Sequence, residues 1–342
     1  MFTVAYIRPV RTPVFASTLL LALAVAPAPA RDLPLVFVAT RAPDASARVS
    51  QESGAAGISD FPRLADANAS LRRWVERSAG AVAGYFGRLP VPRVTITMHW
   101  KSRGAVGYGV THGGARGARI DVDVGPETDE AALAEDWVLT HELVHTAVPR
   151  LPRAATWLDE GLATYVEPIA RVRHGDRAPE KVWGWLAWGL PKGMPRAGDE
   201  GLDTDRSWGR TYWGGALFCF LADVALREET KNRVSLRDAL AGVVNAGGNV
   251  NVSWDLEELL AAADRATGTR VLTSLHARMG AKPLEPDLPA LFASLGVRVE
   301  DGRVSYDDAA PLAAIRRTLP SGATDAPEPQ RPVVPGGPAR QR

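Results

Sequence analysis

Apolar residues recur at two different spacings in the first half of the chain. In residues 61–89 they fall three, four or seven positions apart, which is typical of one face of an amphipathic helix. In residues 92–100 apolar and polar residues alternate, as in a half-buried strand. The glycine-rich stretch 104–125 has the pattern of a hairpin, with alternating apolar positions on its second strand. Residues 33–40 predict a further strand, followed by a polar, mobile loop.

From Asp129 onward the periodicity becomes mainly helical. Helices are expected near 129–148, 156–170, 210–228, 235–246, 254–267 and 269–279, before two short strand-like segments, "VRVE" and "RVSY". Strands followed by helices favour an α+β fold, in which a small sheet packs on a helical lobe. We therefore expect an N-terminal α/β lobe with an edge strand over 31–128 and a helical lobe over 129–319. The proline-rich segment 320–342 lacks apolar anchors and is expected to be disordered.

The N-terminal segment 1–30 has the features of a secretory signal. Arg8 and Arg11 precede the uncharged apolar run "VFASTLLLALAVA", and the segment ends in Ala28-Pro29-Ala30. This arrangement predicts a signal peptide cleaved after Ala30, with an uncleaved anchor as the alternative. A periplasmic or secreted protein is expected, with no membrane span after cleavage.

Charge and cysteine content exclude several kinds of partner and site. The chain has 40 basic and 39 acidic residues, whereas a nucleic-acid binder normally shows a basic excess or stripe. Cys219 is the single cysteine, so neither an intrachain disulfide nor a metal site built on thiolates is available. Oligomeric state is left open.

One apolar helix carries most of the candidate chemistry. In "VLTHELVHTAV", residues 138–148, His141 and His145 are four residues apart, so both imidazoles can reach one ion. Glu142 lies beside that ion. The H-E-x-x-H spacing is typical of zinc sites in which two histidines bind the metal and the glutamate is the general base. A pair of structural histidines is the alternative, but it would leave costly polar groups in an apolar helix without a partner.

A third ligand is expected on the following helix, because catalytic zinc usually has three protein ligands. In "TWLDEGLATYVEP", residues 156–168, Glu160 follows His145 after a short connection, and two prolines in that connection can turn this helix back against the first. We therefore expect Glu160 to be the third ligand, with Asp159 as the alternative. Glu167, on the same face, either accepts the other ring N–H of a zinc-bound histidine or is solvated.

These motifs resemble a known group of peptidases. "HELVH" followed by "WLDEGLATYVE" resembles the gluzincin zinc metallopeptidases, whose second motif reads W-L-N-E-G-x-A. "RTYWGGALFCFLADVALREET" resembles a segment of the glycyl-aminopeptidase family and, more distantly, the chain resembles aminopeptidase N. The likeness covers roughly residues 130–300. It implies a thermolysin-like zincin catalytic domain, with a small mixed β-sheet lobe, a mainly helical lobe and zinc between them.

The resemblance also implies roles for individual residues. It assigns Glu160 as the third ligand of one Zn²⁺ per chain, Glu167 as the supporting glutamate, and Tyr212 as the residue that stabilises an oxyanion. The glutamate with which aminopeptidases read the free amine of a substrate has no counterpart in this chain. Asp121 and Asp123 are the acids available in that stretch.

The expected function is that of an exported zinc-dependent metallopeptidase acting on a peptide or protein substrate. Glu142 would be the general base, and the strand around Arg119 to Val124 a candidate edge for an extended peptide. The alternatives are a zinc-binding envelope or assembly module without peptidase activity, and a non-peptide hydrolase using the same site. The missing amine-reading acid favours an endopeptidase. Three tryptophans in 182–191 either line substrate subsites or pack a short helix on the core.

Overall fold

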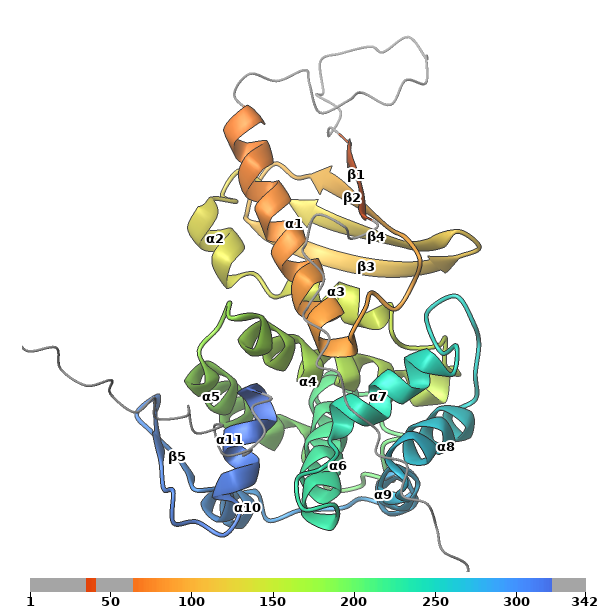
Figure 1. Cartoon of the computed structure of the whole chain (residues 1–342), viewed down its shortest axis with the longest axis vertical. Helices are drawn as coiled ribbons and strands as arrows, with labels where there is room; N and C mark the ends of the chain where they lie inside the picture. Colours follow the sequence, from red (N-terminus) through yellow and green to blue (C-terminus); the bar gives the residue numbers. More distant parts are fainter. Residues whose placement is uncertain (1–34, 41–63, 322–342) are drawn as a thin grey trace, which may run out of the picture.

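The computed structural model describes residues 35–40 and 64–321, in which a small sheet is followed by a run of helices (Figure 1). The expected signal peptide, the expected mobile loop before residue 64 and nearly all of the expected tail lie outside the described residues. The strands are β1 (Leu35–Thr40), β2 (Val94–Trp100), β3 (Val106–Gly114), β4 (Gly117–Val124), β5 (Val297–Glu300) and β6 (Arg303–Tyr306). The helices are α1 (Leu64–Phe86), α2 (Glu130–Glu135), α3 (Val138–His145), α4 (Thr156–His174), α5 (Pro179–Gly189), α6 (Gly215–Glu229), α7 (Leu236–Asn245), α8 (Leu256–Thr267), α9 (Val271–Met279), α10 (Leu288–Leu295) and α11 (Ala313–Ser321).

The main sheet is mixed and has four strands in the order β1-β2-β4-β3. β1 and β4 run parallel to β2, with Ile96 opposite Ile120, while β3 is antiparallel to β4. The alternation predicted for the hairpin is confirmed, because Ile120, Val122 and Val124 are fully buried. The expectation that the strand around Arg119 to Val124 forms an edge is wrong. β2 pairs with β4 on its other side, so β3 is the edge strand on this side of the sheet and β1 is the edge strand on the other.

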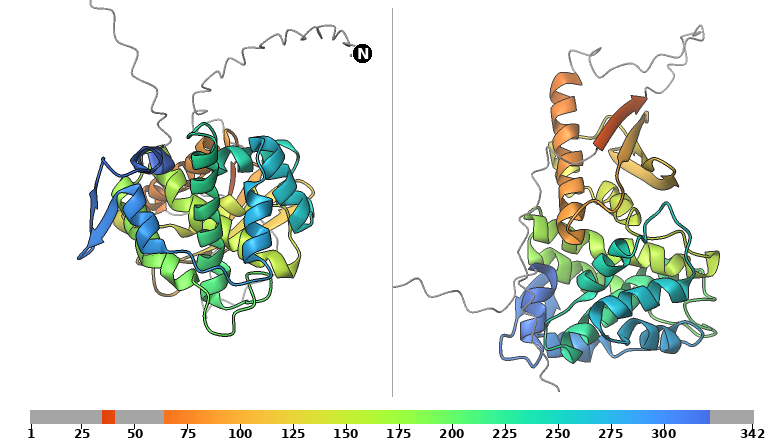
Figure 2. Two further views of the ribbon diagram at one scale, coloured as in Figure 1. Left: turned by 90° about the horizontal axis from the view of Figure 1, so that it is seen from below. Right: turned by 45° about the vertical axis from the view of Figure 1, so that its right-hand side comes forward.

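Helices cover one face of this sheet and form most of the rest of the described molecule. The long helix α1 lies along the sheet and reaches down to the helical lobe, as the turned view in Figure 2 shows. Its buried residues pack in the same core as the apolar faces of β2, β4 and α3. The sheet lobe and the helical lobe therefore share one apolar core.

Helix α4 is the centre of the helical lobe, and a buried polar network joins it to its neighbours. The Tyr165 hydroxyl on α4 donates to Asp223 on α6 over 2.9 Å, and Arg227 donates to the same carboxylate over 2.9 Å. Asp223 also accepts the backbone N–H of Leu236, the first residue of α7. Arg227 in turn donates to Thr318 on α11. The "L-A-D…L-R-E-E-T" segment that resembles the aminopeptidases therefore has a structural role here.

The helical lobe differs from the sequence prediction in three places. The helix expected over 129–148 is broken into α2 and α3, because the Asp136 carboxylate accepts the backbone N–H groups of Val138 and Leu139 and caps a new helix start. The Trp-rich segment forms α5 followed by a 3₁₀ turn, η4 (Leu190–Gly193). α10 and α11 flank the hairpin formed by β5 and β6, and α11 extends to Ser321, just inside the expected tail.

Among the helices that the structure describes, none is both long and apolar enough to span a membrane.

Candidate metal centre

Helix α3 carries three of the predicted site residues, His141, Glu142 and His145, next to one another in a largely buried region. His141 and Glu142 are only 5% and 7% exposed, although both are polar. The four-residue spacing brings the His141 and His145 rings together at a centroid distance of 4.9 Å. Two imidazoles and a carboxylate are thus held where water cannot fully solvate them, and they require partners.

Glu160 on α4 supplies the partner that the two histidines share. One oxygen of its carboxylate, Oε2, lies 3.3 Å from Nε2 of His141 and 3.6 Å from Nε2 of His145. The ligand atoms of these three residues all lie within 4.8 Å of one another, and within the described residues no other group of this kind occurs. α4 therefore returns against α3 as the prolines in the connection predict.

These separations fit a zinc ion. Zinc bound at about 2.0–2.1 Å in a tetrahedron requires its ligand atoms to lie about 3.3–3.4 Å apart. The 3.3 Å distance from Glu160 to His141 equals that edge length, and the 3.6 Å distance to His145 is slightly longer than it. Two imidazoles with one carboxylate are also a ligand set that catalytic zinc sites use. His141, His145 and Glu160 can therefore hold a zinc ion and leave one position open.

Asp159 orients His145 from the side opposite to Glu160. Its Oδ1 lies 2.7 Å from Nδ1 of His145, so the ring N–H donates to this carboxylate and Nε2 remains free to bind a metal. Asp159 is thus in the supporting position and Glu160 in the ligand position, rather than the reverse.

Glu167 lies elsewhere than expected. It is buried and forms an ion pair with Arg171 one turn further along α4, at 3.1 Å, and no contact with His141 or His145 is found among the described residues. Burial raises the pKa of Glu167 to about 7, against the opposing effect of Arg171. The supporting carboxylate of a histidine is therefore Asp159 instead of Glu167. The helical rise from Glu160 to Glu167 is about 10.5 Å, too far to reach the same histidine pair.

We expect Asp159→Ala to lower zinc affinity about 10- to 100-fold, because His145 loses the acceptor that fixes its ring. Asp159→Asn, which keeps an acceptor oxygen, should have a smaller effect. Competition with a chromophoric chelator measures both. The exposed Asp176, beyond the end of α4, provides the control Asp176→Ala. Equal zinc affinities for Asp159→Ala and wild type would exclude this role.

Glu142 is held beside the metal position by the edge strand. The Thr111 hydroxyl on β3 lies 2.7 Å from Oε2 of Glu142 and 2.7 Å from its backbone carbonyl. The strand approaches this closely because residue 109 is glycine: a Cβ there would lie 2.6 Å from Cγ of Glu142 and 2.8 Å from Val138. Thr111 and Gly109 thus fix the rotamer of the predicted general base.

Tyr212 faces the same site from the π-helical turn η5 (Gly209–Gly214). Its ring stacks against His141 at a centroid distance of 6.4 Å, and Trp208 stacks on it at 5.8 Å. Burial, the charge of Glu160 and a hydrogen bond to Glu160 raise the pKa of Tyr212 to about 12. The hydroxyl therefore stays protonated at neutral pH and remains a hydrogen-bond donor.

A contact between two glycines brings Tyr212 to Glu160. Gly161 on α4 faces Gly215 at the start of α6, and a Cβ on Gly161 would lie 2.3 Å from the Gly215 backbone. A Cβ on Gly215 would in turn lie 1.9 Å from the Trp157 carbonyl. The two helix backbones therefore touch directly next to Glu160. η5 precedes α6 without a break, so this contact sets the distance between Tyr212 and the ligand.

Gly161→Ala is expected to destabilise the protein by roughly 1–3 kcal/mol, because the added methyl group meets backbone that cannot move aside alone. Gly84→Ala is the control, and the expected change in stability has the opposite sign. Gly84 lies in α1 with open space where its Cβ would be, so alanine should stabilise by roughly 0.5–1 kcal/mol. Urea unfolding of both variants tests the pair. A stable Gly161→Ala would show that α4 and α6 can separate at no cost.

Three carboxylates concentrate negative charge around the histidines. Burial alone would lower the pKa of His145, but the charge and hydrogen bond of Asp159, with Glu160 and Glu142, raise it to about 10. Burial opposes ionisation of Glu160, yet the hydrogen bond and charge of the histidines hold its pKa below the usual value. The site therefore favours positive charge, and a divalent cation provides it while the ligands are deprotonated.

These groups open into one cavity of about 600 Å³ between the edge strand and the helical lobe. The residues of β3, α3 and α4 named above contribute to its wall, together with Tyr108, Trp137, Pro149, Arg150 and Val250. Its size lies in the range of sites that enclose a small ligand or a short peptide segment.

Other residues that the sequence drew attention to do not line this cavity. Asp121 pairs with His99, His112 and Arg119 on the polar face of the sheet, and Asp123 pairs with Lys101. In the Trp-rich segment Trp183 is buried, while the exposed Trp185 and Trp188 pack against Trp213. The aromatic residues that do line the cavity, Tyr108, Trp137 and Tyr212, come from other parts of the chain.

Comparisons with known proteins agree with this architecture. No family model and no curated protein matches the chain. Among solved structures, an aminopeptidase N family protein from Idiomarina loihiensis aligns with a TM-score of 0.52 and 14% identity, over 69% of this chain and 46% of its own. The fold is that of a zincin catalytic domain. An M1 zinc metallopeptidase from Deinococcus radiodurans aligns at a TM-score of 0.40 and 17% identity, over 63% of this chain and 45% of its own.

This chain spans less than half the length of those two proteins. The alignment shows the shared fold, and the chemistry rests on the residues of this chain. The predicted α+β fold, a small mixed sheet with a mainly helical lobe, is confirmed.

Several residues of the candidate metal centre are not predictable from sequence patterns alone. Thr111 and Gly109 act on Glu142 from a glycine-rich hairpin whose pairing partner was not evident. His112, at the end of the edge strand, also lines the cavity. Arg150 follows α3 closely and lines the cavity, but an arginine is neither a metal ligand nor a general base, so no motif marks it. The adjacency of Asp159 to Glu160 was the one signal that could have identified the supporting carboxylate.

Proposed function

We propose that this chain is an exported zinc-dependent metallopeptidase that hydrolyses peptide bonds. The observation that carries the proposal is the convergence of three ligand atoms, the Glu142 carboxylate and the Tyr212 hydroxyl on a single cavity. A zinc-binding module needs only the ligands. The buried carboxylate of Glu142, held by Thr111, is a further costly feature that hydrolysis explains.

One zinc ion per chain would be held by His141, His145 and Glu160. When bound, zinc supplies Lewis-acid chemistry, which acidifies a water molecule and polarises a carbonyl group.

The side chains of this protein perform the proton transfers and the charge stabilisation. Glu142 takes a proton from the attacking water and passes it to the leaving amine, which general acid–base catalysis by a fixed carboxylate allows. Thr111 keeps that carboxylate in one orientation. The Tyr212 hydroxyl donates to the oxyanion that develops on the scissile carbonyl, and its raised pKa keeps the proton available.

The absence of a spare carboxylate favours internal cleavage over removal of N-terminal residues. The carboxylates that line the cavity are Glu142, Asp159 and Glu160, within the part of the chain that the structure describes. Each of them already has a partner at the site. A free N-terminal amine would therefore find no uncommitted acid to bind.

Export is proposed from the N-terminal sequence. The basic start, short apolar run and Ala-Pro-Ala end of residues 1–30 support secretion or a periplasmic location. Expression of the full chain, followed by fractionation and N-terminal sequencing, tests for a mature protein beginning at Arg31.

Zinc analysis combined with a peptide library tests the function itself. Purified mature protein should contain about one zinc per chain, lose it to a chelator, and cleave peptides whose ends are blocked. Absence of zinc would overturn the proposal. Zinc without cleavage of any peptide would favour the assembly module or, if another ester or amide is hydrolysed, a non-peptide hydrolase.

A further inference from the structure

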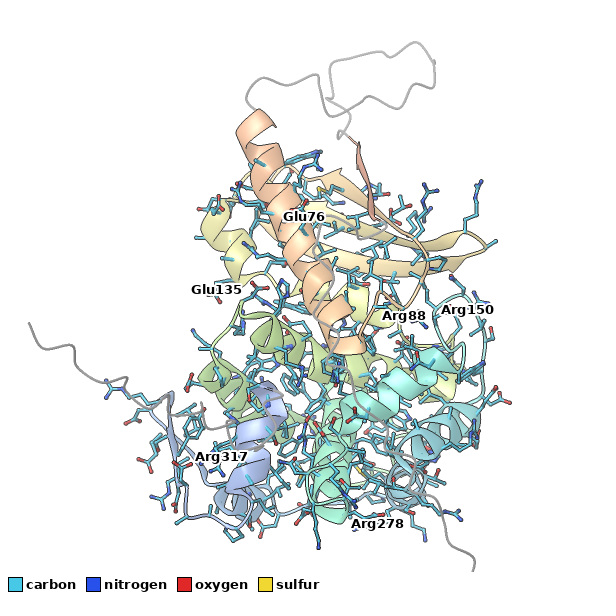
Figure 3. The ribbon with its side chains drawn as sticks, viewed as in Figure 1. Glu76, Arg88, Glu135, Arg150, Arg278 and Arg317 are labelled. Carbon is cyan, nitrogen blue, oxygen red and sulfur yellow. The ribbon has the colours of Figure 1, made fainter. Side chains whose placement is uncertain are left out.

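We infer that Arg150 is a specificity residue that binds a carboxylate of the substrate. The inference rests on the proposed peptidase function and adds the chemical class of its substrate. Arg150 lies at the end of the cavity formed by Val148, Pro149, Val250 and the tip of the edge strand. Figure 3 shows it between the tip of the β3–β4 hairpin and the connection from α7 to α8.

The backbone of Arg150 is fixed on both sides by that connection. Its N–H donates to the Val252 carbonyl over 2.9 Å, and its carbonyl accepts from the Trp254 N–H over 3.3 Å. The same connection is tied to the hairpin, because the Asn251 side chain accepts the Gly114 N–H over 2.9 Å. The connection, Arg150 and the edge strand therefore form one continuous wall of the cavity.

The guanidinium group is oriented by neutral acceptors only. Nε donates to the Ser253 hydroxyl over 3.3 Å, and Nη1 donates to the Val250 carbonyl over 3.4 Å. Across residues 64–321 Arg150 forms no ion pair, so its charge is not compensated by a carboxylate of the protein. A guanidinium has five N–H donors, and three of these are left for a ligand.

A carboxylate is the ligand that this arrangement suits best. The planar fork of arginine matches a carboxylate through two parallel hydrogen bonds, and the two contacts that orient it reduce the entropy lost on binding. Val148, Pro149 and Val250, which line the cavity together with Arg150, carry no charged side chain and offer no competing anion. The carboxylates of the cavity gather instead at the metal position, so the cavity has opposite charge at its two ends. A substrate carboxylate would be repelled from the catalytic end and attracted to Arg150.

Two sources supply such a group in a peptide, namely an aspartate or glutamate side chain and the C-terminal carboxylate. The test uses peptides of one sequence, blocked at both ends. At each position in turn, a peptide with glutamate is compared with the neutral twin that has glutamine there. A further pair differs only in a free or amidated C-terminus. Affinity is measured on zinc-loaded Glu142→Gln protein, in which turnover is slowed, and kcat/KM is measured on the unmodified protein.

Binding and kcat/KM are expected to favour the acid over its neutral twin by at least about tenfold, at one position or for the free C-terminus. Arg150→Gln should abolish the preference and leave neutral peptides and zinc content unchanged, while Arg150→Lys should retain part of it. Arg153→Gln is the matched control, because Arg153 is exposed on the nearby turn η3 (Arg153–Ala155) and lies outside the cavity. It should keep the full preference.

Equal affinity and kcat/KM for the acidic and neutral peptides would overturn the role of Arg150 and leave the peptidase proposal intact. A preference for the acid that survives Arg150→Gln would do the same. Acidic peptides that bind through Arg150 but are never cleaved would overturn the peptidase proposal and leave the binding role intact. Failure to bind peptides of either kind would refute both.

Discussion

Replacement of Glu142 by glutamine is expected to reduce kcat for peptide hydrolysis about 10²- to 10⁴-fold while zinc content stays near one per chain. Glutamine preserves the size of the side chain and an oxygen that can accept from Thr111, so the edge strand keeps its position. It cannot accept a proton from water at neutral pH. Because Glu142 lies beside the ligand atoms and is not among them, the metal should remain bound.

Activity and zinc content must be measured on the same preparation of this variant. Glu135→Gln provides a matched control, since Glu135 is an exposed glutamate of α2 that pairs with Arg177 outside the cavity; its position is labelled in Figure 3. This control should retain full activity. Normal turnover by Glu142→Gln would show that another group takes the proton. Loss of zinc would instead make Glu142 a ligand.

The core of the site was predictable because its geometry is local. His141 and His145 are fixed relative to each other by one turn of helix, so their spacing in sequence is also their spacing in space. Glu160 was predictable for a related reason, since a short connection with two prolines brings α4 back against α3. The candidate metal site therefore depends on few long-range contacts, and a single sequence contains most of its information.

The supporting residues were less predictable, because they depend on contacts between distant segments. Thr111 reaches Glu142 only because β3 is the edge strand, and that depends on β2 pairing in parallel with β4, past the strand that lies between them in sequence. Either strand of the hairpin is a candidate edge until this pairing is known. In hindsight the glycine-rich, half-exposed β3 was the better choice, since β4 carries the fully buried residues.

Glu167 shows how helical periodicity can mislead when the rise along the axis is neglected. Residues seven apart share a face but are separated by about 10.5 Å, whereas Asp159 and Glu160 lie at nearly the same height. Asp159 and Glu160 are consecutive residues and project from α4 in different directions. Asp159 contacts Nδ1 of His145, and Glu160 lies near Nε2 of the same ring. The position along the helix axis decides which carboxylates can reach His145. The direction in which each side chain projects then decides whether it contacts the ring as a metal ligand or as a supporting acceptor.

His145→Ala is expected to lose both zinc and hydrolytic activity. The two remaining ligands, His141 and Glu160, lie on different helices and cannot complete a three-ligand site. The loss should also be visible without any substrate. A metal bound only by the folded protein stabilises it, so chelation should lower the melting temperature of wild type. His145→Ala should melt at one temperature with or without chelator, because it has no metal to lose.

His174→Ala is the control for this change, since His174 is exposed at the last turn of α4, away from the cavity. It should keep the zinc content, the activity and the chelator-dependent shift of melting temperature. Zinc analysis and thermal unfolding of both variants, each with and without chelator, measure the difference. A His145→Ala protein that retains one zinc per chain would contradict the assignment. The ion would then be held elsewhere, and the convergence of His141, His145 and Glu160 would have another cause.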